Sequence, residues 1–417
     1  MRLRRHRYAA VRSRSRLSGD REERRRVRGG GRLQPNAARP PRGDAEGHGS
    51  RQGGGLRVQR PSHASHVVLR LRQRPQPRQD TLGASQGRTL VKVVAIGGGT
   101  GLPVVLTALR RHLAARDRIT AVVTAADDGG SSGALRKEYG VIPPGDIRNC
   151  LLALARVAPE VSAALQYRFD GGVAQHPVGN LLLAALDMVA TDGLTAIRLA
   201  AELLGVDDLV LPSTTERVHL VAELADGRSV YGESAIPRSG APIKRVRIDP
   251  ATAVAAPIVL EALREADAII LGPGSLYTSL LATLVVPGVA EAVTSSSAVR
   301  IFVCNAMTEP GETEGYGIAE HLQALAEHGL PLDTLHYVVA PTTPIPSKVL
   351  GRYASQGAEP VDADFSLPDP SPVTIRADLL ELGPVVRHNP DKLGPILCDL
   401  AARRRDTVRM ARVPAQV

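Results

Sequence analysis

The stretch LVKVVAIGGGTGLPVVLTALRRHL, residues 90–113, joins three sequence patterns. Its first seven residues are mostly β-branched and almost wholly apolar, which is typical of a strand buried on both faces. The glycine-rich segment GGGTG, residues 97–101, follows, and apolar residues then recur at helical spacing from Val104 to Leu113. A buried strand, a glycine turn and a helix in this order predict an α/β fold with a parallel sheet.

The same alternation continues along the chain. We expect further buried strands at residues 119–125, 268–271, 299–304, 336–340 and 373–377, and helices at 146–157, 180–190, 195–204 and 391–403. A different pattern interrupts this rhythm, because RVHLVAEL and RSVYGES have period two and are joined by Asp226-Gly227. That combination predicts an antiparallel hairpin. The sequence therefore predicts a mostly parallel sheet in one domain, residues 90–405, with an antiparallel insert at about residues 208–250.

The charge of the chain is concentrated at one end. The 417 residues carry a net charge of +10, but residues 1–90 hold 23 Arg, no Lys and 6 acidic residues, a net of +17, so residues 91–417 carry −7. Few large apolar residues are present in the basic segment to offset the entropy of ordering it. We expect residues 1–89 to be a disordered extension, produced by a start codon assigned too far upstream. An RNA-binding arm and a transit peptide are the alternatives, and residues 406–417 are expected to fray.

Composition excludes several classes of protein. Only three cysteines occur, Cys150, Cys304 and Cys398, without a CxxC pair, so a disulfide framework or structural zinc site is not expected. No apolar run reaches the roughly 20 residues of a membrane span. These features favour a cytoplasmic protein, and the acidic folded part disfavours nucleic acid as a partner.

The glycine loop GGGTG is the first candidate binding element. Amide groups at a helix N-terminus carry partial positive charge, and glycine allows a phosphate to approach them closely. The loop is not a dinucleotide fingerprint, because Leu102 occupies the position of the third glycine, and no Gly-Lys-Ser/Thr follows as in a P-loop. The alternative is a tight turn that needs glycine for its geometry alone.

The segment TAADDGGSSGALR, residues 124–136, places two carboxylates directly after the second buried strand. Ligands of open α/β sheets bind outside these strand ends. Asp127 and Asp128 are candidates for contacting a ribose or for holding Mg²⁺, which is usually bound by one or two carboxylates plus phosphates and water. Ser131 and Ser132 are candidates for phosphate contacts. The alternative for either Asp is to cap the next helix.

Further loops rich in glycine and polar residues follow other strands or begin helices. PPGDIRN supplies Asp146, as a metal ligand or a helix cap; HPVGN, GPGSLYTS and CNAMTEPGET are the others. No base–nucleophile set is evident. His176 is interpreted as a polar surface residue, with a role as acid or base as the alternative, and Cys304 and Cys150 are interpreted as core. Lys244 and Arg245 are interpreted as solvated surface, with contacts from the insert as the alternative.

These motifs, taken together, resemble the YvcK/CofD-like family of bacterial gluconeogenesis factors. The resemblance extends over about residues 91–400 and includes IGGGTGLP, ITAVVTAADDGGSSGALR, IPPGDIRN, GNLLLAAL, GESAIPRSG, ADAIILGPGSLYTS, CNAMTEPGETEGY and RHNPDKL. It implies a Rossmann-like core with helices on both faces of the sheet, which binds a nucleotide or nucleotide-sugar. In the related transferases, Mg²⁺ is held by acidic residues, which implies Asp128 and Asp146 as metal ligands here. The expected ligand-binding residues are Gly97, Gly98, Gly99, Thr100, Gly101, Asp127, Asp128, Ser131, Ser132, Asn149, Asn180, Gly272, Gly274, Ser275, Tyr277, Thr278 and Asn305.

Two functions are consistent with the resemblance. The first is a non-catalytic regulator that binds a UDP-sugar-like ligand and acts on partners in envelope synthesis, with a role in cell shape and cell-wall precursor metabolism. The second is a Mg²⁺-dependent transferase of the 2-phospho-L-lactate type. Aromatic residues are only 3% of the chain and Trp is absent, which disfavours a large stacking pocket for a deazaflavin and so favours the regulator. A dehydrogenase is disfavoured by the broken fingerprint, and homo-oligomerisation is left open.

Overall fold

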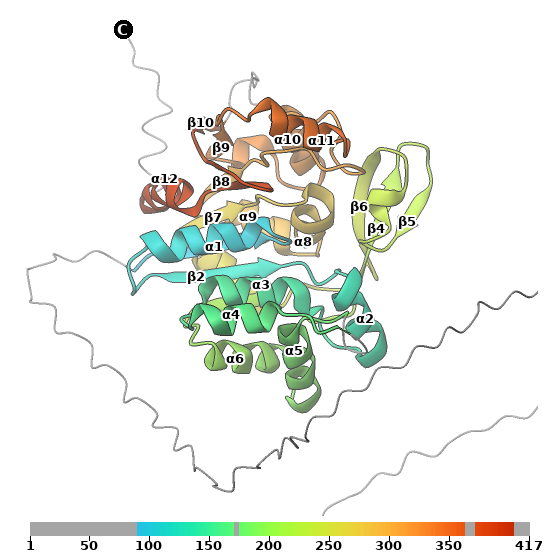
Figure 1. Cartoon of the computed structure of the whole chain (residues 1–417), viewed down its shortest axis with the longest axis vertical. Helices are drawn as coiled ribbons and strands as arrows, with labels where there is room; N and C mark the ends of the chain where they lie inside the picture. Colours follow the sequence, from blue (N-terminus) through green and yellow to red (C-terminus); the bar gives the residue numbers. More distant parts are fainter. Residues whose placement is uncertain (1–89, 171–174, 363–371, 404–417) are drawn as a thin grey trace, which may run out of the picture. The chain divides into compact units, whose positions relative to one another are not determined.

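The computed structural model describes residues 90–170, 175–362 and 372–403. The extension expected at residues 1–89 and the tail expected at 406–417 lie outside these residues. Figure 1 shows the described part as a central sheet between helical layers, with a small sheet at one side.

A seven-stranded parallel sheet forms the centre of the fold, in the order β10-β9-β8-β7-β1-β2-β3. Its strands are β1 (Lys92–Gly97), β2 (Arg118–Val123), β3 (Leu209–Pro212), β7 (Ala268–Leu271), β8 (Val299–Val303), β9 (Tyr337–Pro341) and β10 (Val373–Ala377). The strands that the sequence patterns predicted match these bounds to within a residue or two at most ends. The predicted α/β class with a mostly parallel sheet is confirmed.

Helices cover both faces of this sheet. Their bounds are α1 (Gly101–His112), α2 (Gly130–Tyr139), α3 (Pro144–Leu154), α4 (Pro159–Gln166), α5 (Val178–Val189), α6 (Gly193–Leu203), α7 (Pro257–Glu265), α8 (Ala282–Leu284), α9 (Val289–Ser295), α10 (Ile318–Glu327), α11 (Ser347–Ala354) and α12 (Pro390–Ala402). Short helical turns are η1 (Ile236–Arg238), η2 (Leu276–Leu281) and η3 (Leu332–Thr334). Two short strands, β11 (Leu380–Leu382) and β12 (Val386–His388), pair with each other.

The alternation of side chains along β1 explains why this strand reads as continuously apolar. Val93 and Ala95 pack in the core formed with α1, α3 and α12, whereas Val94 and Ile96 pack in the core formed with α7 and α10. Complete burial of a side chain such as Ile96 contributes about 1.5–3 kcal/mol to folding. The strand is therefore covered on both faces, as its composition predicts.

The insert is a three-stranded antiparallel sheet in the order β5-β4-β6, with β4 (His219–Leu224), β5 (Ser229–Tyr231) and β6 (Ile243–Asp249). The hairpin turns at Gly227, whose φ of +85° is readily adopted by glycine. The predicted start of the insert at residue 208 is wrong, because Leu209–Pro212 pairs with β2 as the last strand of the main sheet. An apolar run such as LVLP suits a strand of the main sheet as well as a strand of the insert, so its composition does not show which sheet it joins.

Hydrogen bonds on two sides attach the insert to the main body. The Asp128 carboxylate accepts a hydrogen bond of 2.8 Å from the Ser234 amide, and the Arg136 guanidinium donates to the Val218 carbonyl. On the opposite edge of the insert, the Val246 amide donates to His328 Nε2 at 3.0 Å. The insert is thus anchored both to the acidic turn after β2 and to the end of α10.

Within residues 90–170, 175–362 and 372–403, no single helix is both long and apolar enough to cross a membrane. The bent pair Leu276–Leu284 and Val289–Ser295 meets the length and composition criteria only when its two halves are counted together.

Candidate functional site

The two glycine loops meet at the carboxyl edge of the sheet. β1 pairs with β2 on one side and with β7 on the other. The strands β2 and β3 extend the sheet from β1 in one direction, and the strands β7 to β10 extend it in the other. Ligands of open α/β sheets bind where the strand order changes direction in this way. A Cβ added to Gly101 would lie 2.1 Å from the Pro273 carbonyl oxygen, and one added to Gly274 would lie 3.1 Å from the Gly98 carbonyl oxygen. Glycine at these positions therefore permits the GGGTG and GPGSLYTS loops to touch.

Asp146 connects the glycine loop to α3. The Gly99 amide donates a hydrogen bond of 3.0 Å to Asp146 Oδ1, and a Cβ on Gly98 would lie 2.4 Å from Asp146 Oδ2. α3 begins at Pro144, so Asp146 lies in its first turn and does not act as the N-cap. Burial, followed by the nearby charge of Asp127, raises the pKa of Asp146 to about 6. Since one loop amide is taken by Asp146, the amides of the N-cap Thr100 and of Gly101, the first residue of α1, are the donors best placed for an anion.

The acidic turn after β2 has a different role for each Asp. Asp127 Oδ1 accepts from the Gly129 amide at 2.9 Å, and burial raises the pKa of this carboxyl. Asp128 is turned toward the insert, where it accepts from the Ser234 amide. Neither Asp forms the side-chain cap of α2, whose N-cap is Gly129. Asp127 therefore faces Asp146, and Asp128 links the site to the insert.

Three of four predicted site residues in this region form one hydrogen-bonded chain with two neighbours. Ser131 Oγ lies 2.9 Å from His176 Nδ1 and accepts from Asn180 Nδ2 at 2.9 Å. The Arg148 guanidinium donates to the amide oxygens of Asn180 and Asn149, at 2.6 and 2.8 Å. A serine–histidine contact thus exists where the sequence shows no base–nucleophile set. Ser131 is also buried and held by Asn180. The fourth predicted residue, Ser132, accepts from the Gly145 amide at 3.0 Å and belongs to the same packed layer.

The second glycine loop is fixed by side chains from the segment after β8. Asn305 Oδ1 accepts from the Gly274 amide and Asn305 Nδ2 donates to the Gly274 carbonyl, both at 2.9 Å. Glu312 accepts from the amides of Tyr277 and Thr278 and from Thr278 Oγ1, the last at 2.7 Å. The chain continues from Ser275 into η2, a π-helical turn, and such turns are frequent at functional sites.

Two adjoining cavities open beside these loops. The first has a volume of about 290 Å³ and is lined by Thr100, Gly101, Gly274 and Asn305 among others; the second, of about 370 Å³, is lined by Thr100 and Asn149. Both are bordered by Thr100, Val104 and Arg387, so they flank the start of α1. Each lies near the lower end of the range of ligand pockets, and together they lie well within it.

The predicted site residues thus occupy two layers. Thr100, Gly101, Asn149, Gly274 and Asn305 line the cavities. Ser131, Ser132, Asn180, Tyr277 and Thr278 are buried in the networks behind them. Gly97 and Gly272 end the two strands, and Gly98, Gly99 and Ser275 form the turns. Their contact with a ligand stays a prediction.

Several charged residues of the site were missed at the sequence level. Arg387 lines both cavities, and the half-buried Glu309 lines the first. Glu233, from the insert, lies close to Asp127, and burial together with Asp127 and Asp128 raises its pKa to about 8. All three residues lie in segments that carry the family resemblance, namely RHNPDKL, CNAMTEPGETEGY and GESAIPRSG. The sequence around each residue, however, does not indicate which polar side chain faces the site.

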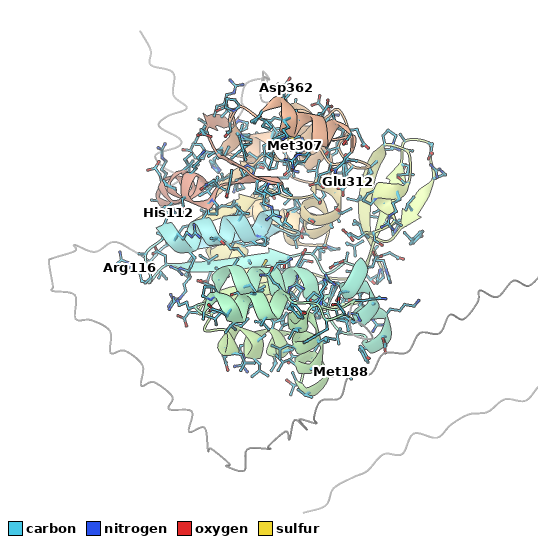
Figure 2. The ribbon with its side chains drawn as sticks, viewed as in Figure 1. His112, Arg116, Met188, Met307, Glu312 and Asp362 are labelled. Atoms are coloured by element: carbon cyan, nitrogen blue, oxygen red, sulfur yellow. The ribbon has the colours of Figure 1, made fainter. Side chains whose placement is uncertain are left out.

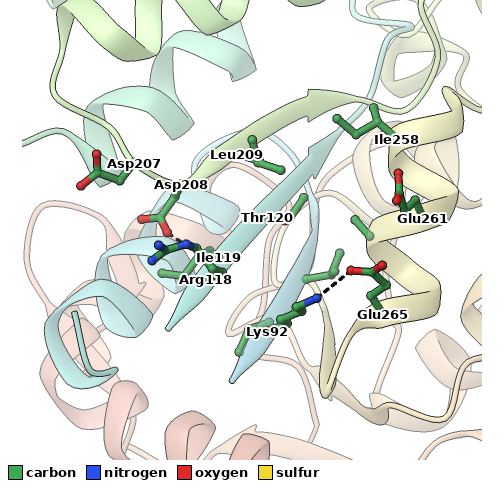
Figure 3. A pocket seen from close by; sticks show the side chains of 13 residues that line it. Lys92, Arg118, Ile119, Thr120, Asp207, Asp208, Leu209, Ile258, Glu261 and Glu265 are labelled. Carbon is green, nitrogen blue, oxygen red and sulfur yellow. Dashed lines mark hydrogen bonds and ion pairs between the residues drawn. The ribbon is translucent and has the colours of Figure 1, made fainter. Parts of the chain in front are cut away.

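A third cavity, of about 300 Å³, lies at the opposite end of the strands (Figure 3). It is lined by the first residues of β1, β2 and β3, and its charged groups are largely paired. Lys92 bonds to Glu265 at 2.7 Å, and Asp208 accepts from Arg110 and from the Ile119 amide. These pairs fasten strand starts to helices, and the cavity lies at the edge of the sheet where ligands of this architecture do not bind.

The expected metal site was tested against the donors that are present. Within the described ranges, no group of three or more His, Cys, Asp or Glu side chains is arranged to hold a metal ion. Mg²⁺, however, needs only one or two protein carboxylates when phosphates and water complete its shell. Asp146, Asp127 and Asp128 each accept a backbone amide through one oxygen only, so each carboxylate retains a second oxygen that could meet this smaller requirement.

Comparison with known proteins finds matches over most of the chain. Residues 93–380 match the family model described as 2-phospho-L-lactate transferase CofD. The chain is 42% identical over 313 residues to the gluconeogenesis factor of Bacillus subtilis, covering 74% of this chain and 98% of the relative. It is 41% identical over 321 residues to that of Halalkalibacterium halodurans, covering 76% and 98%. A crystal structure of a UPF0052 family member from Bacillus halodurans aligns with a TM-score of 0.70 at 41% identity, covering 75% of this chain and all of that one.

The family model thus matches the part of the chain that contains the main sheet, the insert and the loops after β1, β2, β7 and β8, whereas Arg387 lies beyond it. The chain belongs to the CofD family, among the YvcK-type gluconeogenesis factors.

Proposed function

We propose that this protein is a cytoplasmic regulator that binds a nucleotide-sugar, of the UDP-sugar type, at the carboxyl edge between β1 and β7. Its bound state would be read by protein partners in envelope synthesis, in support of cell shape and cell-wall precursor metabolism. The observation that carries the proposal is the pair of adjoining cavities that flank the N-terminus of α1 and share Arg387.

The chemistry of the cavities suits a pyrophosphate between two uncharged groups. Amides at the start of α1 and the Arg387 guanidinium supply positive charge near the shared border. Tyr353 in the first cavity offers a flat apolar face, and Asn149 and Asn305 offer hydrogen-bonding groups on either side. A diphosphate at the border would place the base in one cavity and the sugar in the other.

Asp146, with Asp127 or Asp128 of the acidic turn, would hold Mg²⁺ against the phosphates. The metal would neutralise carboxylates that burial and mutual repulsion make costly to ionise. The protein itself would bind and orient the ligand through its amides and Arg387. The alternative function is a Mg²⁺-dependent transferase, which the name of the matching family model favours.

Isothermal titration calorimetry of the whole protein tests the proposal, with a panel of UDP-, GDP- and ADP-sugars, in the presence and absence of Mg²⁺. We expect one UDP-sugar to bind, and Arg387→Ala to weaken it by at least about tenfold, since a charge-assisted contact to phosphate is lost. Arg116→Ala is the matched control, because Arg116 lies at the far end of α1 from the site (Figure 2). Asp146→Asn and Asp128→Asn should reduce the effect of Mg²⁺.

Binding that is equally strong in the Arg387→Ala and wild-type proteins would refute the assignment of the site. Turnover of the bound nucleotide-sugar, followed by phosphorus NMR, would support the transferase instead of the regulator.

A further inference from the structure

A second groove, separate from the nucleotide site, runs from β4 and β6 of the insert to the α8–α9 junction of the main body. It joins a cavity of about 580 Å³ beside the α8–α9 junction to a smaller one of about 180 Å³ on the insert itself. The two share Glu223, Arg245, Val246 and Arg247, so they form one elongated depression. We call it the insert groove.

The charges in the insert groove leave two guanidinium groups available. Among the residues that the structure describes, the Arg247 guanidinium has no hydrogen-bond or ion-pair partner, and the Arg245 guanidinium donates only to the Glu327 carbonyl, at 3.2 Å. Glu223, their acidic neighbour, is already paired with Lys244 at 2.7 Å. Glu291 also lines the larger cavity. With Glu223 neutralised by Lys244, the two guanidinium groups and Glu291 leave an excess of positive charge in the groove.

The spacing of the two arginines is set by β6. Arg245 and Arg247 are opposite Glu223 and Val221 of β4 in regular antiparallel register. Side chains two residues apart on a strand point to the same side, about 6.5–7 Å from each other. Carboxylates two residues apart on an extended peptide have the same spacing and can meet both guanidinium groups.

The rest of the groove is apolar and its position is fixed. Val285, Pro287 and Ala290 line the larger cavity from the α8–α9 junction. The His328 ring, which also lines it, holds β6 in place by accepting from the Val246 amide. An elongated, open groove of this kind fits a peptide better than a compact small molecule, which needs an enclosing pocket.

We propose that the insert groove is a docking site for an extended, acidic segment of a partner protein, in which carboxylates alternate with apolar residues. Arg245 and Arg247 bind the carboxylates, and the α8–α9 junction receives the apolar side chains. The site lies outside the nucleotide cavities and does not depend on the proposed ligand there.

Fluorescence anisotropy of the whole protein tests the proposal with a fluorescein-labelled peptide in which glutamate and valine alternate. We expect binding that weakens with added salt. The double variant Arg245→Glu/Arg247→Glu should weaken it by at least about tenfold, because two attractive contacts become repulsive. Arg264→Glu, a charge reversal on α7 outside both cavities, is the matched control and should change binding less than about twofold.

Three further measurements make the test decisive. A peptide with lysine in place of glutamate should not bind, and a peptide of the same composition with its glutamates in one block should bind more weakly. The single variants Arg245→Gln and Arg247→Gln, checked by circular dichroism, should each weaken binding without loss of fold. Failure of the alternating peptide to bind the wild-type protein, equal binding to the double variant, or complete displacement by millimolar citrate would overturn the proposal.

Discussion

At the scale of single residues, the site is unusual in its buried carboxylates. Glu312, which is labelled in Figure 2, is 6% exposed and holds the start of η2 through three hydrogen bonds. Burial, and then the charge of Glu309, raises its pKa from 4.5 to about 7. The hydrogen bonds act in the opposite direction but do not compensate for the loss of water.

We therefore predict a pH-dependent effect of Glu312→Gln. The folded state binds the Glu312 proton more strongly than the unfolded state, so this group favours folding below pH 4.5, and its contribution is lost as the pH rises through 7. At pH 8 the ionised carboxylate costs about 3 kcal/mol, to order of magnitude. Glutamine fits the same space and removes that cost.

Urea unfolding at pH 5 and pH 8 measures the effect. The variant should be more stable than the wild type at pH 8, and the difference should largely disappear at pH 5. A variant that is less stable than the wild type at both pH values would show that the ionised form is the one the fold favours.

At the scale of elements, the insert depends on a few specific contacts with the main body. The His328 ring is buried, its Nδ1 lies 2.6 Å from the Ala324 carbonyl, and its Nε2 accepts from the Val246 amide. This arrangement requires the neutral ring, and burial lowers the pKa of His328 accordingly. The free edge of β6 is thus closed by a side chain of the α10 C-terminus.

His328→Leu should release this edge. The Val246 amide would be left buried without an acceptor, which costs about 1–3 kcal/mol in the free energy of unfolding. Hydrogen exchange followed by mass spectrometry should show faster exchange in β6, with little change in β1 and β2. His219→Leu, an exposed position at the start of β4, is the control. Unchanged exchange in β6 of the His328 variant would contradict the role assigned to this contact.

The elements also show what the sequence could and could not predict. The parallel sheet was predictable because each buried strand is a short apolar run with a glycine-rich or polar loop after it, as in Leu90–Gly101. The hairpin was predictable from Asp226-Gly227. The start of the insert was not, because the run Leu209–Pro212 is apolar whether it joins the main sheet or a small one. Strand partners are decided by long-range packing.

The loops that line the cavities were predictable to about the same extent as the strands. The glycine loops and Asn305 were identified because residue type and position after a strand limit what they can do. Arg387 was missed because it lies nearly at the other end of the chain from Thr100, on a strand of three residues, and its sequence neighbours give no sign of that contact. Likewise, the bond between Ser131 and His176 joins two loops that are adjacent only in the folded chain.

At the scale of the whole molecule, one sheet edge gathers loops from most of the chain. The segments after β1, β2, β7 and β8 meet there, and β12 and the insert add Arg387 and Glu233. The insert groove lies on another face, so that ligand and partner would occupy separate surfaces. This separation is what a protein needs if it is to sense a metabolite with one site and report it with another.

The central claim is that this edge binds the diphosphate of a nucleotide-sugar. A crystal structure of the protein with the UDP-sugar selected by calorimetry tests it most directly. The account predicts phosphate oxygens within hydrogen-bond distance of the Thr100 or Gly101 amides and of Arg387, with the base and the sugar in the two adjoining cavities. Phosphates located at the amino ends of the strands, beside Lys92 and Arg118, would contradict it.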